Sequence, residues 1–79
     1  MIEKHDLLHE FPEYRERIHA LKLENNYFLR IFDEYHSIDR EVRRIETEVE
    51  VSSDFYLEEK KKRRLLLKDR LYKIISASA

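Results

Sequence analysis

A long stripe of apolar and aromatic side chains runs through the middle of the chain at alternating steps of three and four residues. Its members are Phe28, Ile31, Tyr35, Ile38, Val42, Ile45 and Val49. Side chains at this spacing share one face of an α-helix and are typical of a helix that packs against another helix. The stripe therefore predicts a helix over about 26–50 with coiled-coil-like packing.

A shorter stripe precedes it, with Phe11, Tyr14, Ile18 and Leu21 at steps of three, four and three. Pro12 suits the first position of a helix, because the N–H that proline lacks has no partner there. We expect a helix over about 12–23, preceded by residues that are frayed or loosely helical. A helix of this length is close to the lower limit of independent stability, so it must dock on the rest of the chain.

The junction at Asn25 permits two interpretations. Asparagine is a good N-cap and a poor residue for a helix interior, which predicts a break. The spacing from Leu21 through position 25 to Phe28 is unbroken, which also permits one continuous helix. We favour a break or sharp bend, with Asn25 capping the second helix.

Small polar residues at Ser52 and Ser53 predict a turn, followed by a third helix over about 54–76. A short connection makes two helices antiparallel neighbours. We expect Ile38 to face Leu67 and Tyr35 to face Leu71; the other predicted pairs are Ile31 with Ile74 and Val49 with Tyr56. The predicted fold class is all-α: one domain over 1–79, a short N-terminal helix followed by a long antiparallel helical hairpin.

Apolar residues gather at the end of the hairpin away from the turn, in excess of what two or three helices can bury. We therefore predict a homo-oligomer; an unidentified protein partner is the other candidate occupant of this surface. The predicted self-association surface comprises Leu29, Phe32, Leu65, Leu66, Tyr72 and Ile75.

The opposite end of the hairpin is highly charged. Its basic run, Lys60, Lys61, Lys62, Arg63 and Arg64, is the basis of an alternative function, a nucleic-acid-binding accessory protein. Five consecutive helical residues wrap around the axis, however, and the facing helix is rich in glutamate. We favour a solvated end whose charges are neutralised internally, with lysine and arginine stems covering Val42 and Ile45.

Composition argues against several classes of function. The 79 residues include no glycine and no cysteine, so phosphate-binding glycine loops, disulfides and thiolate metal sites are excluded. Charged residues make up 42% of the chain, yet the formal net charge is -1, which gives no general attraction to nucleic acid or to anionic membranes. The first residues lack the apolar run of a signal peptide or membrane span. We expect a cytoplasmic protein without a membrane partner.

Candidate chemistry is sparse. His5 and His9 stand four residues apart, a spacing that can hold a divalent metal, but the glutamate pattern of a metalloprotease is missing. A catalytic carboxylate needs a concave, partly dry pocket, for which a small helical hairpin has little room. We predict no enzyme activity, no catalytic, cofactor-binding or metal-binding residues and no small-molecule substrate.

Several segments together resemble the YdcH-like family of small bacterial proteins. They are residues 9–15 (HEFPEYR), 21–25 (LKLEN), 32–36 (FDEYH), 38–41 (IDRE) and 65–71 (LLLKDRL). The resemblance implies a cytoplasmic helical hairpin preceded by a short helix, with a tendency to form homo-oligomers. It brings no catalytic residues, since the biochemical function of that family is not established.

Overall fold

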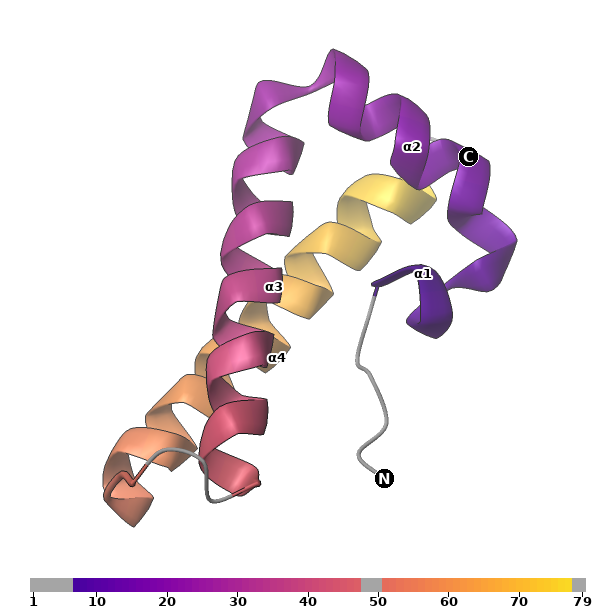
Figure 1. Cartoon of the computed structure of the whole chain (residues 1–79). Coiled ribbons are helices and arrows are strands. Elements are labelled where there is room, and N and C mark those ends of the chain that lie inside the picture. Colours follow the sequence, from indigo (N-terminus) through magenta and orange to yellow (C-terminus); the bar gives the residue numbers. More distant parts are fainter. Residues whose placement is uncertain (1–6, 48–50, 78–79) are drawn as a thin grey trace.

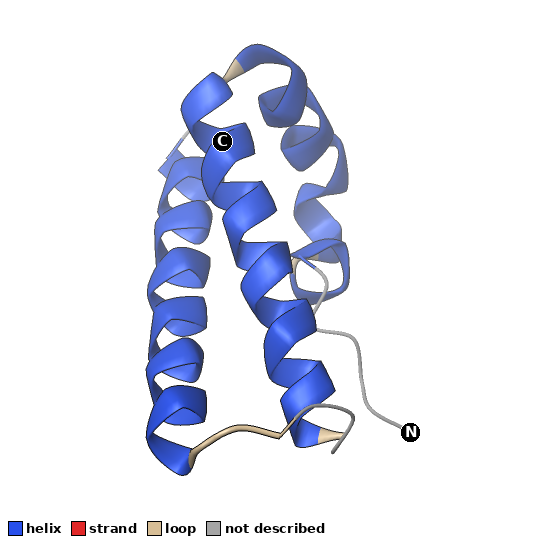
Figure 2. Ribbon diagram, turned by 60° about the vertical axis from the view of Figure 1, so that its left-hand side comes forward, coloured by secondary structure: helices blue, strands red, loops and turns tan. Residues whose placement is uncertain are grey.

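A computed structural model describes residues 7–47 and 51–77, without the side chains of Leu8 and His9. These residues form short elements at the N-terminal side and two long helices (Figure 1). In chain order the elements are α1 (Leu7–Glu10), the 3₁₀ helix η1 (Pro12–Tyr14), α2 (Arg15–Glu24), α3 (Asn26–Glu46) and α4 (Asp54–Ala77). The two long helices pack antiparallel, and α2 folds back beside α3 (Figure 2). The predicted all-α class is confirmed.

Asn25 ends α2 and begins α3. Its backbone is extended, with φ -126° and ψ 104°, and its side-chain Oδ1 accepts a hydrogen bond of 3.0 Å from the backbone N–H of Phe28. This is N-cap geometry, in which a side chain satisfies an amide that the first turn of a helix leaves unpaired. The predicted break at Asn25 is confirmed, and the continuous helix is wrong.

The turn between the long helices is also capped by its own residues. The hydroxyl of Ser53 accepts a hydrogen bond of 3.1 Å from the N–H of Tyr56, which places Ser53 as the N-cap of α4. At the other side, the Thr47 hydroxyl donates to the carbonyl of Arg43 at 2.8 Å. Thus α3 ends at Glu46, earlier than the predicted end at residue 50; Val49 and its predicted contact with Tyr56 lie outside the described residues.

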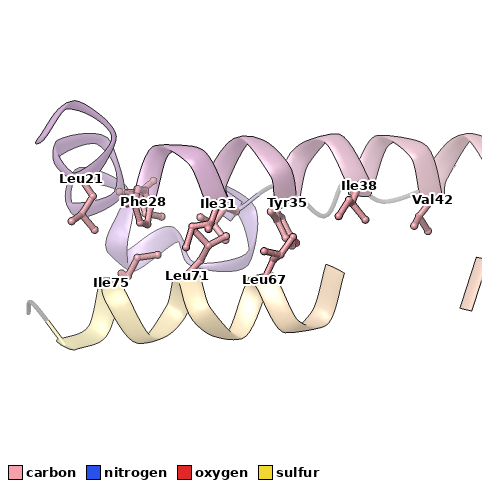
Figure 3. Packing of buried hydrophobic residues seen from close by; sticks show 11 residues of the cluster. Leu21, Phe28, Ile31, Tyr35, Ile38, Val42, Leu67, Leu71 and Ile75 are labelled. Atoms are coloured by element: carbon pink, nitrogen blue, oxygen red, sulfur yellow. The ribbon is translucent and has the colours of Figure 1, made fainter. Parts of the chain in front are cut away.

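The earlier end of α3 changes the register of the hairpin. In Figure 3, Leu67 lies beneath Tyr35 and Leu71 beneath Ile31, about one helical turn from the predicted pairs of Ile38 with Leu67 and Tyr35 with Leu71. The ion pair of Arg64 with Asp39 fits this shifted register. The predicted pairs assumed a shorter connection between the helices than the chain adopts, so the register was wrong although the antiparallel arrangement was right.

The core is supplied unequally by the two long helices. From α3, every stripe position in the described residues is buried, from Phe28 to Ile45. From α4, the buried hydrophobic residues are Leu67, Leu71 and Ile75, all in its C-terminal half. Ile18 and Leu21 of α2 complete the core at that end. Val42 and Ile45, near the turn, are also buried, and the half-buried residues in the part of α4 before Leu67 are Leu57, Lys60, Lys61 and Arg64.

Residues 7–10, in the segment predicted to be frayed or loosely helical, form the short helix α1. Leu7 begins α1 and is fully buried in the core. Its backbone N–H donates to Nε2 of His36 at 3.4 Å, and the Nδ1 of the same ring lies 3.0 Å from the carbonyl of Phe32. The histidine therefore ties α1 to α3. Pro12 begins η1, and the regular α-helix follows from Arg15.

Replacing Asn25 by alanine should lower the free energy of unfolding by about 0.5 to 2 kcal/mol, because the amide of Phe28 loses its cap. Urea unfolding followed by circular dichroism measures this change. Asn26→Ala is the matched control, since Asn26 is exposed in the first turn. Equal stability of the two variants would contradict the capping role.

Candidate interaction surface

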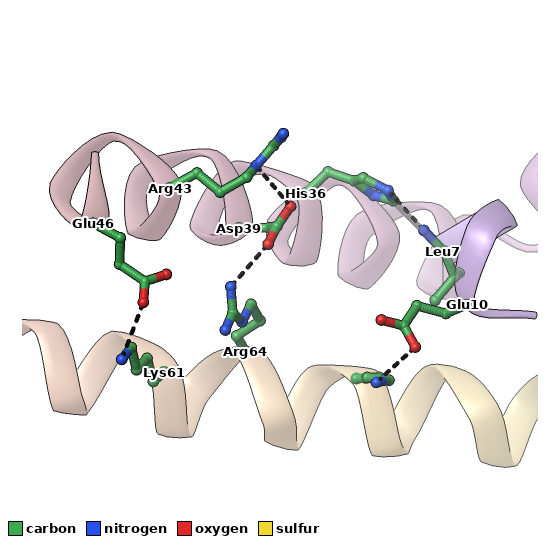
Figure 4. A network of polar contacts seen from close by, with 9 residues as sticks. Leu7, Glu10, His36, Asp39, Arg43, Glu46, Lys61 and Arg64 are labelled. Carbon is green, nitrogen blue, oxygen red and sulfur yellow. Dashed lines mark hydrogen bonds and ion pairs between the residues drawn. The ribbon is translucent and has the colours of Figure 1, made fainter. Parts of the chain in front are cut away.

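Each residue of the basic run has a carboxylate partner. The distances between charged atoms are 3.4 Å for Lys60 with Glu41, 3.2 Å for Lys61 with Glu46, 3.7 Å for Lys62 with Glu59, 2.9 Å for Arg63 with Glu34 and 2.9 Å for Arg64 with Asp39. All of these acids except Glu59 belong to α3, so the run joins the two long helices (Figure 4). This arrangement favours a charged end that is neutralised internally over a phosphate-binding stripe.

Among the charged groups of residues 7–47 and 51–77, Asp39 is the most deeply buried, with 1% of its surface exposed. Arg64 of α4 donates to Oδ1 at 2.9 Å, and Nε of Arg43 lies 3.3 Å from Oδ2 as an ion pair along α3 (Figure 4). A buried carboxylate is costly unless it is paired and hydrogen-bonded. Asp39 therefore requires Arg64 opposite it, which favours one register of the hairpin.

A second polar cluster joins Glu41 of α3 to Tyr56 and Lys60 of α4. The Tyr56 hydroxyl donates to Oε2 of Glu41 at 2.7 Å, and Lys60 Nζ lies 3.4 Å from Oε1. The hydrogen bond from Tyr56, aided by the Lys60 charge, lowers the pKa of Glu41. The same hydrogen bond raises the pKa of Tyr56, and the Glu41 charge raises the pKa of Lys60. The cluster is thus most stable with Glu41 ionised.

The predicted self-association residues do not form one surface. Ile75 is fully buried within the subunit, so its assignment to an exposed surface is wrong. On α3, Leu29 and Phe32 are half-buried, and Phe32 packs against the core. Tyr72 is partly covered by the rings of Phe11 and Tyr14, at centroid distances of 5.1 and 6.3 Å. Phe32 and Ile75 are covered, and Tyr72 is covered in part, because α1, η1 and α2 enclose more of the open end than was predicted from the sequence.

Leu65 and Leu66, together with Tyr72, which is 43% exposed, are the predicted residues that face solvent. Leu65 is 60% exposed and Leu66 is 43% exposed, although both belong to the helix that supplies Leu67 to the core. Phe55, near the start of the same helix, is 77% exposed and was missed. The sequence analysis did not select Phe55, because it lies close to the charged run and only its helical spacing from Leu66 indicates that the two residues share a side of α4. The candidate interaction surface is the solvent side of α4.

A groove lies where α2 meets α3, with a volume of about 570 Å³, and sequence reasoning did not find it. It is lined by Arg15, Glu16, Ile18, His19, Lys22 and Phe32. Lys22 Nζ sits 4.6 Å from the centre of the Phe32 ring, a cation–π contact. The lining combines apolar residues with charged residues of both signs, so the groove shows no preference for one class of ligand.

The histidine pair of the N-terminal segment falls outside this description, since His5 and the side chain of His9 are not among the described groups. Across residues 7–47 and 51–77, no cluster of three or more His, Asp or Glu side chains is placed to hold a metal ion. Among the helices in these ranges, none is long and apolar enough to cross a membrane.

Fold and surface together define a small helical-hairpin protein with a short helical cap over one end. The chain belongs to the family described as "Protein of unknown function (DUF465)", whose model matches residues 28–75. That range holds nearly all of α3 and the part of α4 that supplies its core residues Leu67, Leu71 and Ile75. The family assignment confirms the resemblance deduced from the sequence.

Two relatives extend this assignment toward the N-terminal helices. The chain is 38% identical over 65 residues to the "Uncharacterized protein YdcH" of Escherichia coli (strain K12), a match that covers 82% of this chain and 88% of that protein. The protein of the same description from Shigella flexneri matches to the same extent. No solved structure is significantly similar.

Replacing Asp39 by alanine should lower the free energy of unfolding by about 1 to 3 kcal/mol, because Arg43 and Arg64 lose a carboxylate on the buried side of α3. Chemical denaturation is the appropriate measurement. Asp33→Ala provides the control, since it removes an exposed aspartate of the same helix. If both variants were as stable as the wild type, Asp39 would not hold the hairpin together.

Replacing Tyr56 by phenylalanine should raise the pKa of Glu41 toward its ordinary value of 4.5. Because the folded-state pKa of Glu41 is lowered, its stabilising effect is present above the ordinary value and is lost as the pH falls through the lowered one. NMR titration of the Glu41 carboxyl carbon reports the shift. The control is Tyr27→Phe, which alters another exposed tyrosine and should leave the Glu41 pKa unchanged.

Proposed function

We propose that this protein is a non-enzymatic helical interaction module that associates with a second copy of itself, in the bacterial cytoplasm that the family resemblance implies. The observation that carries the proposal is the pair Leu65 and Leu66, which stand exposed in the middle of α4. Neighbouring apolar side chains on the solvent side of a helix are typical of surfaces that bind another protein. A second copy is the simplest partner, because it is present wherever the protein is made.

Size supports the same proposal. A domain of 79 residues with no disulfide has a small core, and association adds stability by burying further apolar surface. The core of this subunit draws on the C-terminal half of α4, while the N-terminal half meets α3 mainly through charged side chains. Association along α4 would add apolar contacts to the long helix that has fewer of them.

The charged groups support a structural role rather than catalysis. Asp39, Glu41 and Glu46 are engaged by basic residues of α4. Groups committed to such pairs hold the two helices in place. The nucleic-acid alternative would require the same lysines and arginines to exchange these partners for phosphates, which makes it the weaker proposal.

Light scattering after size-exclusion chromatography, at tens of micromolar protein, should give the mass of a dimer or larger assembly. Replacing Leu66 by glutamate should shift the mass toward that of the 9.8 kDa monomer, because it places charge in the proposed interface. Leu23→Glu is the matched control, since Leu23 is 78% exposed on α2. Circular dichroism checks that both variants keep their helices.

A wild-type protein that remains a folded monomer at these concentrations would overturn the proposal. So would a Leu66→Glu variant that keeps its helices and associates as well as the wild type. Dissociation of the Leu23→Glu variant alone would place the contact on α2 and not on α4.

A further inference from the structure

The solvent side of α4 has a definite pattern of charged and apolar groups. Seven exposed residues lie within an arc of about 100° on a helix of 3.6 residues per turn, on the opposite side from the core residues Leu67 and Leu71. The first is Phe55; the other six, in order along the helix, are Glu58, Lys62, Leu65, Leu66, Asp69 and Lys73. We call these six residues the outer face of α4.

The order of charges along the outer face distinguishes two orientations of a second copy. From the N-terminal end it reads negative, positive, two leucines, negative, positive. A parallel copy in register would place Glu58 against Glu58 and Lys62 against Lys62, which are repulsive contacts. An antiparallel copy centred between Leu65 and Leu66 would instead place Glu58 against Lys73 and Lys62 against Asp69 of the second copy.

We propose that two copies pair antiparallel through the outer face of α4, about a two-fold axis that passes between Leu65 and Leu66. This inference rests on the self-association proposed above and specifies its geometry. A two-fold axis repeats every contact, so each complementary charge pair occurs twice. The leucines form an apolar centre and the charges a polar rim, the usual arrangement of a protein interface.

The rest of the subunit is compatible with this pairing. α3 packs on the opposite side of α4, where Leu67, Leu71 and Ile75 are buried, and α1 and η1 approach it near Lys68 and Tyr72. The outer face can therefore accept a second helix without displacing an element of its own subunit. Helices that pack in this way lie 8–10 Å apart, close enough for facing side chains to touch.

Cysteine cross-linking tests the orientation, because the chain contains no cysteine of its own. Leu66→Cys lies beside the proposed axis and should form a disulfide-linked dimer under mild oxidation, since a disulfide needs Cα atoms about 4.4–6.8 Å apart. Phe55→Cys is the matched variant on the same side of α4. In the antiparallel pair its two copies would lie roughly 30 Å apart along the axis, so it should remain unlinked.

Exchange of charges provides an independent test. Lys73→Glu should weaken dimerisation roughly 2- to 30-fold, because two exposed attractive pairs become repulsive. The double variant Glu58→Lys/Lys73→Glu should restore it. Within one helix the double exchange spoils the favourable pairs of Glu58 with Lys62 and Asp69 with Lys73, so recovery can arise only between two helices. Arg30→Glu, an exposed charge change on α3, should leave dimerisation unchanged.

The possible failures are distinguishable. A wild type that is monomeric by light scattering overturns the self-association itself. A dimer in which Phe55→Cys cross-links as readily as Leu66→Cys overturns the antiparallel orientation and indicates a parallel pair. A dimer in which neither cysteine cross-links, or in which the double charge exchange brings no recovery, places the contact on another surface and overturns the inference alone.

Discussion

The fold depends on a mismatch between its two long helices: the apolar seam of α3 is longer than the apolar face of α4 that covers it. Beyond Tyr35 toward the turn, α3 still buries Ile38, Val42 and Ile45, whereas α4 buries no hydrophobic residue before Leu67 among those described. The remaining seam is covered by half-buried, largely charged side chains of α4. At the opposite end both helices are apolar, and the short N-terminal elements supply the third wall of the core.

The charged half of the hairpin contributes to specificity more than to overall stability. Exposed ion pairs such as that of Lys61 with Glu46 contribute little, typically about 0 to 1 kcal/mol each. Asp39 differs, because it is buried and would be costly if the helices slid by one turn and carried Arg64 away from it. Without this carboxylate, the apolar contacts of the seam alone would disfavour such a shift less strongly.

The features that local physics determines were predicted correctly from the sequence. The stripe of α3, the cap at Asn25 and the turn at Ser53 depend on residues within a few positions of one another. The predictions that failed concern features that depend on residues far apart in the sequence. The burial of Leu7 depends on contacts with remote parts of the core and on a bond to His36, and the register depends on where Thr47 ends α3. Likewise Ile75 differs from Leu66 only in the side of α4 that faces the core, which the register and the position of α2 determine. The candidate surface was therefore predicted in part, through Leu65 and Leu66.

The unequal division of the core also bears on how the protein acquires its structure during synthesis. The ribosome makes α3 before α4, and the part of α4 that covers Phe28, Ile31 and Tyr35 is its later half. Until Leu67, Leu71 and Ile75 have been translated, the seam of α3 has no hairpin partner, and a nascent helix of this kind is exposed to aggregation. Folding of the hairpin is therefore a late event in translation.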